Sequence, residues 1–239
     1  MLICRSVPEA DTALINRLLS FDTATVDESL GRGSAMSREI RPLVNGMRLC
    51  GRAVTAACYY GDNLMLHCAL ELAGSGDVIV CDTGGGADVA VWGDIMTLQA
   101  QRTGVAGLIT NGSVRDTRAI RESGFPVFRS GISMRGPSKP ALGSVNHPIS
   151  VGGIIVNPGD IVFGDDDGVV VVPRERLSEA VVKAGERAQA EQKIREAILN
   201  GARLYDLLKV EESLRKLGCA ENARDERNTS KGEEMLCTT

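Results

Sequence analysis

The sequence predicts an α/β fold in which helices cover a mixed sheet. Three observations lead to this prediction. Short runs rich in β-branched residues alternate with segments of helical periodicity in the middle of the chain. Several β-branched runs then follow one another closely in the later part, which a regular doubly wound sheet would not have. A long charged segment of helical character follows them.

Two short helices are predicted near the start of the chain. Leucine and isoleucine recur at helical spacing over residues 14–19. Asp22 and Thr23 can cap a second helix that continues to Leu30, because short polar side chains accept hydrogen bonds from the first helical amides. We expect both helices to pack on the sheet.

The strands and the helices between them are predicted from composition and periodicity. Runs of β-branched residues bounded by turn-forming residues are typical of strands. These runs are residues 52–56, 77–81, 105–110, 126–129, 149–156, 160–163 and 169–172. The helical segments between them are residues 63–73, 95–102 and 117–122.

The C-terminal part predicts a long helix and then a shorter one. Pro173 has a fixed φ that suits a first helical turn, and we expect this helix to end near Leu199, before Gly201. Its exposed length suggests contacts between subunits, and a further helix is expected over residues 204–217. The rest is polar and poor in large apolar groups. We therefore expect a single domain at residues 1–217 and a disordered tail at residues 218–239.

Composition excludes several classes of protein. The 239 residues are 43% hydrophobic, enough for one substantial core, and the net charge of -4 argues against a nucleic-acid partner. Seven cysteines without a C-x-x-C pair are typical of reduced thiols. Charged residues interrupt any signal peptide at the start, and no apolar run is long enough to span a membrane. We expect a soluble, cytoplasmic protein without a membrane partner.

Three charged residues follow two of the predicted strands. The strand at 105–110 leads through a turn to Arg115 and Asp116, and Asp94 follows the glycine-rich loop after the strand at 77–81. The carboxyl ends of strands are where α/β folds usually build their sites. If the two strands are neighbours, the three side chains meet over one pocket.

These residue types suit the chemistry of a 2-oxo acid. A hard divalent cation held by Asp116 and several waters can chelate the carboxylate and keto oxygens of such a substrate. Arg115 can bind the same group through its fork of donors, and Asp94 can position a water that delivers a proton. No lysine Schiff base is needed in this scheme.

The spacing of these residues resembles a known signature. Asp94, twenty intervening residues and then Arg115-Asp116 are similar to the signature of the 4-hydroxy-4-methyl-2-oxoglutarate / 4-carboxy-4-hydroxy-2-oxoadipate aldolases, in the superfamily of the regulator of ribonuclease E activity A. The resemblance covers about residues 10–210. Further matching segments are residues 22–26, 61–64 with His67, 76–80, 156–160 and 168–173.

The resemblance implies a role for each residue of the site. Asp116 would be the direct ligand of Mg²⁺ or Mn²⁺, Arg115 would bind the substrate, and Asp94 would hold the proton-donating water. The backbone amides of Ile95 and Met96 would bind the pyruvoyl carboxylate, which the start of a helix also favours physically. The implied fold is an αββα sandwich that resembles the swivelling domain of phosphohistidine proteins.

The resemblance also implies an assembly and a reaction. Glu191 would reach the water shell of the metal from a neighbouring subunit of a homotrimer or homohexamer. The enzyme would be a class II pyruvate aldolase and lyase with a small 2-oxo acid as substrate. It would release pyruvate together with pyruvate or oxaloacetate, and would have oxaloacetate decarboxylase activity besides. The context would be the degradation of aromatic compounds.

Other interpretations stay open at this stage. Non-catalytic members of the superfamily have glycine where Asp94 stands and an acidic residue where Ala119 stands, and both differences favour the aldolase over a ribonuclease E inhibitor. A dedicated oxaloacetate decarboxylase is a further alternative. An Arg-Asp pair at a helix start is usually only a cap, and Glu191 lies in a charged helix whose solvated face is the default.

Several motifs are assigned ordinary structural roles. The glycines at 84–86 indicate a flexible substrate-shaping loop rather than a phosphate cradle, and Asp165-Asp166-Asp167-Gly168 a hairpin turn rather than a calcium site. His67 is interpreted as a packed structural histidine. Lys139 and Arg135 are both candidates for selecting a distal carboxylate, and no side chain stands out as the general base.

Overall fold

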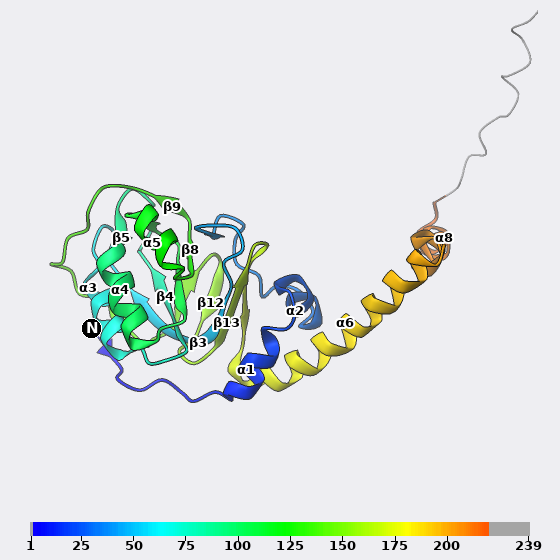
Figure 1. Ribbon diagram of the computed structural model, residues 1–239, viewed down its shortest axis with the longest axis horizontal. Coiled ribbons are helices and arrows are strands. Elements are labelled where there is room, and N and C mark those ends of the chain that lie inside the picture. Colours follow the sequence, from blue (N-terminus) through cyan, green and yellow to red (C-terminus); the bar gives the residue numbers. More distant parts are fainter. Residues whose placement is uncertain (1, 220–239) are drawn as a thin grey trace, which may run out of the picture. The chain divides into compact units, whose positions relative to one another are not determined.

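The computed structural model describes residues 2–219 (Figure 1). Its contacts divide the chain into two compact units, residues 1–189 and residues 190–239. The domain boundaries expected from the sequence stay a prediction, and most of the expected tail lies outside the described residues. The helices are α1 (Thr12–Leu18), α2 (Thr23–Ser29), α3 (Leu64–Leu72), α4 (Asp94–Thr103), α5 (Thr117–Ser123), α6 (Leu177–Leu199), α7 (Leu204–Leu207) and α8 (Val210–Lys216).

The first unit contains a mixed sheet of nine strands among the described residues. Its strands are β1 (Leu2–Ile3), β2 (Arg41–Pro42), β3 (Leu49–Ala57), β4 (Asp77–Asp82), β6 (Gly107–Thr110), β8 (Val127–Arg129), β10 (Ser144–Val145), β13 (Ile161–Asp165) and β14 (Gly168–Val172). The order is β1-β10-β3-β4-β6-β8-β2, and the hairpin β13–β14 pairs with β3. The central strands β3, β4, β6 and β8 are parallel to one another. Strands β10 and β13 pair antiparallel with β3, β2 pairs antiparallel with β8, and β1 pairs parallel with β10.

The alternation of side chains along the strands separates three hydrophobic clusters in the described part of the chain. On β4, Val78 and Val80 face one cluster, whereas Ile79 and Cys81 face another. This follows from the period of two in a strand, because successive side chains point to opposite faces. On β14 the same alternation places Val169 and Val171 in the cluster of Val78, and Val170 and Val172 in a third cluster.

Each cluster belongs to a different pair of layers. Helices α3, α4 and α5 cover one face of β3, β4 and β6, as Figure 1 shows. Helices α1, α2 and the beginning of α6 pack on the outer face of β13 and β14. The middle cluster lies between the halves of the curved sheet, where a second hairpin, β11 (Ile149–Val151) and β12 (Ile154–Val156), also contributes. The mixed α/β fold expected from the sequence is therefore confirmed.

Three expected elements differ from the structure. The run at 149–156 is not one strand, because Gly152 and Gly153 both have positive φ and form the tight turn of the β11–β12 hairpin. The expected helix at 204–217 is divided into α7 and α8 at Lys209, which has φ 50°. The long helix begins with a 3₁₀ turn, η1 (Arg174–Arg176), before α6.

A small parallel sheet was missed by the sequence analysis. It has the order β5-β7-β9 and consists of β5 (Ala90–Trp92), β7 (Ser113–Val114) and β9 (Gly131–Ile132). Strands of two or three residues are too short to produce a recognisable alternation. This small sheet positions the residues of the candidate site.

Two further findings concern the described residues as a whole. None of their helices combines the length and the apolar character that crossing a membrane requires. The six cysteines among them are free thiols, which is the state expected from their spacing.

Candidate active site

The two charged segments of the predicted site meet because the strands before them are paired in two sheets, the main sheet and the small one. In the main sheet β4 pairs parallel with β6, as the sequence analysis required. In the small sheet β5 pairs parallel with β7, and the Arg115 amide donates to the Trp92 carbonyl at 3.0 Å. Asp94 follows β5 after Gly93, at the start of α4, and Asp116 follows β7 after Arg115. The carboxyl ends of two parallel strands therefore bring these segments together.

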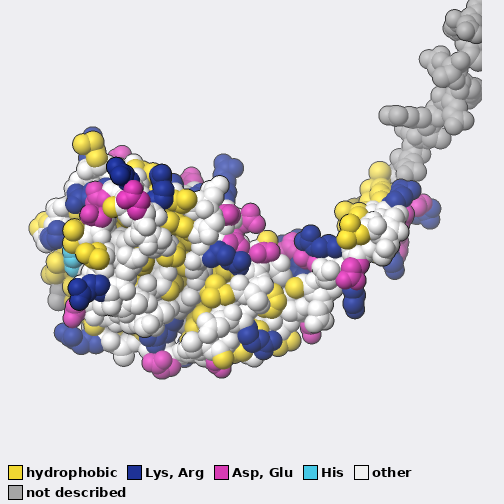
Figure 2. Space-filling model, viewed as in Figure 1, with side chains coloured by type: hydrophobic (Ala, Val, Ile, Leu, Met, Phe, Trp, Pro, Cys, Tyr) yellow, Lys and Arg dark blue, Asp and Glu magenta, His cyan; other side chains and the backbone are white. Residues whose placement is uncertain are grey.

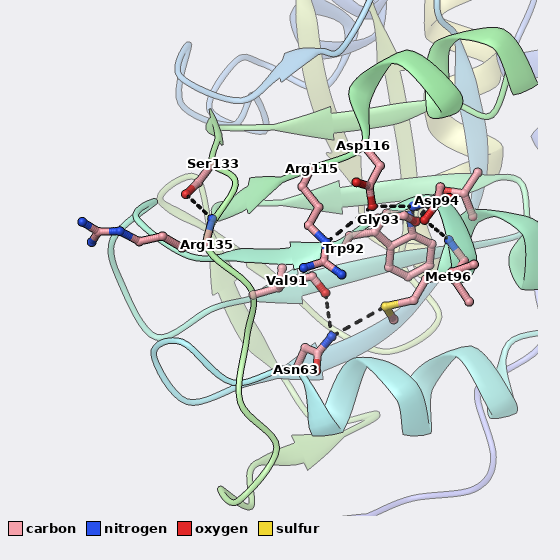
Figure 3. A network of polar contacts seen from close by, with 12 residues as sticks. Asn63, Val91, Trp92, Gly93, Asp94, Met96, Arg115, Asp116, Ser133 and Arg135 are labelled. Carbon is pink, nitrogen blue, oxygen red and sulfur yellow. Dashed lines mark hydrogen bonds and ion pairs between the residues drawn. The ribbon is translucent and has the colours of Figure 1, made fainter.

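The three residues form a connected polar network, which Asp94 joins through its backbone amide (Figure 3). The Asp94 amide donates to Asp116 Oδ2 at 3.3 Å, and Arg115 Nε lies 3.4 Å from the same oxygen. The Ile95 amide donates to Asp94 Oδ1 at 2.8 Å. The Arg115 and Asp116 side chains are 45% and 38% exposed, so both can contact a ligand from solution.

Asp116 does not act as the simple helix cap that its position suggests. It precedes α5 at the N-cap position, yet its side chain makes no capping hydrogen bond. Its backbone is left-handed, with φ 55° and ψ 35°, a conformation that costs energy for any residue with a side chain. The carboxylate is thereby directed to Arg115 and to the start of α4 (Figure 3).

Gly93 makes this close approach possible. A Cβ atom at this position would lie 2.4 Å from Asp116 Oδ2 and 3.3 Å from Arg115 Cγ. The φ of Gly93 is -153°, which any residue can adopt, so the requirement is steric and arises from the neighbouring side chains. A glycine between the tryptophan and Asp94 is therefore part of the site.

Buried contacts hold the segment before Asp94 in place. The indole Nε1 of Trp92 donates to Thr97 Oγ1 at 2.8 Å, and the ring stacks on Phe125 with centroids 6.2 Å apart. Asn63, at the start of α3, donates from Nδ2 to the Val91 carbonyl at 2.9 Å. These side chains are almost completely buried, so the backbone that presents Asp94 is rigid.

A cavity of about 230 Å³ lies over this network. The cavity is lined by all five of the site residues that the sequence predicted within one subunit. These are Asp94, Ile95, Met96, Arg115 and Asp116. The amides of Ile95 and Met96 belong to the first turn of α4, where helical amides lack intrahelical acceptors. Because the Ile95 amide donates to Asp94 Oδ1, a substrate carboxylate at this amide would replace that bond.

The interpretation of His67 as a packed residue is wrong. The buried face of α3 consists of Met65, Leu66, Ala69 and Leu70, which turns His67 outward. It lines the cavity together with Lys139. Although the His67 side chain is exposed, its partial desolvation at the cavity wall, and secondly the positive charge of Lys139, lower its pKa below the ordinary value. The signal available in the sequence was the spacing of the core residues, which excludes position 67 from their face.

The remaining expected site residues are placed as follows. Glu191 lies on α6 within the second unit, and its role toward a neighbouring subunit stays a prediction. Arg135 does not line the cavity, and its side chain points away from Arg115 in Figure 3. The glycine loop lines another cavity, at Gly85 and Gly86, so the expectation that it shapes this pocket is wrong.

The acidic triplet at the end of β13, Asp165 to Asp167, has a structural role. Asp165 accepts from the amide and hydroxyl of Thr23 at 2.8 and 2.7 Å, and Asp166 accepts from the Gly46 amide. Asp165 and Gly168 pair directly at the end of the β13–β14 hairpin. The turn expected from the sequence is confirmed.

The residues present fit a divalent cation that keeps most of its water. Among residues 2–219 there is no group of three or more His, Cys, Asp or Glu that could hold a metal ion. Asp116 offers one half-exposed carboxylate at the cavity. Mg²⁺ is commonly bound by one or two carboxylates plus waters and substrate oxygens, so a single carboxylate suits this ion better than zinc.

Comparisons with known proteins identify the family. The family model described as RraA-like: Aldolase/RraA matches residues 23–171. A protein of Halalkalibacterium halodurans named "Putative 4-hydroxy-4-methyl-2-oxoglutarate aldolase" is 33% identical over 192 residues, which are 80% of this chain and 91% of that protein.

Solved structures agree with this assignment. An uncharacterized protein from Pseudomonas syringae superposes with a TM-score of 0.74 at 30% identity, covering 83% of this chain and 98% of the other. Streptomyces coelicolor RraAS2, described as an unusual member of the RNase ES inhibitor RraA protein family, superposes with a TM-score of 0.69 at 28% identity, covering 79% and 100%. Because the family model matches more than half of the chain and a relative is 33% identical over 80% of it, the chain belongs to the RraA-like family of aldolases and RraA proteins.

Proposed function

We propose that this protein is a divalent-metal-dependent class II pyruvate aldolase. Its substrates would be 4-hydroxy-4-methyl-2-oxoglutarate, 4-carboxy-4-hydroxy-2-oxoadipate or both, and pyruvate would be released with pyruvate or oxaloacetate. The observation that carries the proposal is the convergence of Asp94, Arg115 and Asp116 on one cavity at the start of α4. A purely structural helix cap would not leave the Asp116 carboxylate directed into that cavity.

The metal would be held by Asp116. When bound, Mg²⁺ or Mn²⁺ stabilises the negative charge that develops on the 2-oxo oxygen of the substrate as the bond between C3 and C4 breaks. Glu191 of a neighbouring subunit would complete the water shell, which requires a homotrimer or homohexamer. The αββα likeness to the swivelling phosphohistidine domain and a cytoplasmic location belong to the same proposal.

Arg115 and Asp94 would act directly on the substrate. The Arg115 guanidinium donates to the 2-oxo oxygen or to the adjacent carboxylate, and its contact with Asp116 holds it in position. Asp94 orients a water that returns a proton to C3 of the pyruvate enolate, balancing the proton lost from the C4 hydroxyl. The positive end of α4 favours a carboxylate at the amides of Ile95 and Met96.

Two alternatives define what the experiment must separate. Loss of carbon dioxide from oxaloacetate produces the same pyruvate enolate, so decarboxylation should accompany the aldolase and could be the main activity. A ribonuclease E inhibitor would act through protein contact and would not need Asp94. The presence of Asp94, whose backbone amide donates to Asp116, favours an enzyme.

The test follows pyruvate release with a lactate dehydrogenase coupled assay. Racemic 4-hydroxy-4-methyl-2-oxoglutarate and oxaloacetate are each supplied with Mg²⁺, with Mn²⁺ and with chelator. Chelator-sensitive pyruvate from the aldol substrate supports the proposal, whereas release from oxaloacetate alone indicates a decarboxylase. If neither substrate releases pyruvate, the protein is not an enzyme of this class, and binding to the ribonuclease is then measured by pull-down.

A matched pair of variants tests the site itself. Arg115→Ala should lower kcat/KM by at least about 100-fold, because a charge-assisted contact to the reacting group is lost. Arg118 lies three residues further on, is 89% exposed and pairs with Glu122, so Arg118→Ala should retain full activity. Full turnover by Arg115→Ala would refute the assignment.

A further inference from the structure

The cavity has a second polar wall that the proposed chemistry does not use. One wall consists of the Asp94 to Met96 segment and Asp116. The other is formed by α3 and the loop before β10, and it contributes Asn63, His67, Gly136, Pro137 and Lys139. No carboxylate belongs to this second wall.

The loop that carries Lys139 is fixed to the start of α3. The Ser138 amide donates to the Gly61 carbonyl at 2.8 Å, and the Ala141 amide donates to Asp62 Oδ2 at 3.1 Å. Asp62 is itself only 1% exposed, so this attachment is rigid. Lys139 is therefore held at the cavity by backbone contacts on both sides of it.

Lys139 contributes an ammonium group to this wall. Among the residues that the structure describes, no carboxylate forms an ion pair with it. Its neighbour His67 has a lowered pKa, first through partial desolvation and then through the Lys139 charge, and a neutral imidazole still presents one N–H donor. The wall thus offers an ammonium group and a hydrogen-bond donor to whatever enters the cavity.

We propose that Lys139, with His67 beside it, binds a second carboxylate of the substrate and selects 2-oxo acids that carry one. This inference rests on the proposed function, which assigns the first carboxylate to Arg115 and the start of α4. Arg135, the other cation of this segment, does not line the cavity, and its side chain points away from Arg115 in Figure 3. The specificity residue is therefore Lys139.

Two ligands of matched length test the proposal by binding. 2-Oxoglutarate has a second carboxylate but no C4 hydroxyl, so it cannot be cleaved, and 2-oxopentanoate has a methyl group in place of that carboxylate. Calorimetric titration of the full chain with Mn²⁺ present should give an affinity about fivefold higher for 2-oxoglutarate, as expected of a partly exposed ion pair. Lys139→Met should abolish this preference and leave the affinity for 2-oxopentanoate unchanged.

Control variants separate charge from folding. Lys139→Arg should retain most of the preference, and Arg135→Met, which removes a cation from the same segment, should retain all of it. Equal affinity of the unaltered protein for the two ligands, or a preference that survives Lys139→Met, overturns the subsite while leaving the aldolase intact. Failure of both ligands to bind with Mn²⁺ overturns the proposed function as well.

Discussion

The substitution Gly93→Ala separates the geometry of the site from the stability of the fold. The new Cβ would lie 2.4 Å from Asp116 Oδ2, whereas ordinary contacts begin near 3.4 Å. The carboxylate must therefore move by about 1 Å. That movement weakens the contacts of Asp116 Oδ2 with the Asp94 amide, at 3.3 Å, and with Arg115 Nε, at 3.4 Å.

The expected effect on stability is small. A displaced side chain costs roughly 0.5–1.5 kcal/mol, and alanine in place of glycine at an allowed φ recovers about 0.4–1 kcal/mol by restricting the unfolded chain. The free energy of unfolding should therefore stay within about 1 kcal/mol of the original. Activity should fall about 100-fold, since displacements of this size at a reacting group have that effect.

The assay compares pyruvate release with urea-induced unfolding for the same variant. Gly74→Ala is the matched control, because its Cβ would lie 3.5 Å from the nearest atom, Asp77 Oδ2, in ordinary contact. Full activity of Gly93→Ala would refute the argument that Asp116 must occupy its present position. A loss of more than about 3 kcal/mol would show instead that this glycine serves the fold.

Three further predictions concern binding, stability and titration. Asp116→Asn should weaken Mn²⁺ binding at least about 10-fold in an electron paramagnetic resonance titration, because a neutral amide replaces the charged ligand. Asp77→Asn should destabilise the protein by about 2–3 kcal/mol in urea unfolding, since the Asp77 side chain is only 4% exposed and its negative charge, 2.8 Å from Arg52 Nε, would be lost. The imidazole of His67 should titrate below 6.5 by NMR, and Lys139→Met should raise its pKa partway.

The lowered pKa of His67 makes the stability of the fold depend on pH. A lowered pKa means that the folded protein binds this proton less readily than the unfolded chain does. The His67 contribution to stability is thus present above the unfolded pKa near 6.5 and declines as the pH falls toward the folded value. An unchanged His67 pKa in Lys139→Met would contradict the proximity of the two side chains.

Charges on the surface around the site are mixed. On the face shown in Figure 2, basic and acidic side chains are interspersed over the region of α4 and α5. Long-range attraction of an anionic substrate would therefore be modest, and recognition would depend on contacts inside the cavity. For this reason we expect single cavity residues such as Arg115 and Lys139 to have larger effects than surface charges.

The sequence alone predicted the main elements of the fold and the residues of the candidate site. The strands of the main sheet with β-branched runs were located to within a few residues, because alternation and composition are local properties of the chain. Helices α3, α4 and α5 were predicted because helical periodicity is also a local property of the chain. Asp94, Arg115 and Asp116 could be selected because their positions after strands and their spacing are also readable along the chain.

Only the tertiary structure decided how these residues meet. The small sheet β5-β7-β9 depends on pairing between residues 18 to 23 positions apart in the sequence, which leaves almost no local pattern. The steric need for Gly93 arises from the side chains of Arg115 and Asp116, which reach it from the segment after β7. Likewise the left-handed conformation of Asp116 and the position of Lys139 beside His67 result from contacts distant in sequence. Local periodicity determines elements, and packing between them determines which side chains share a cavity.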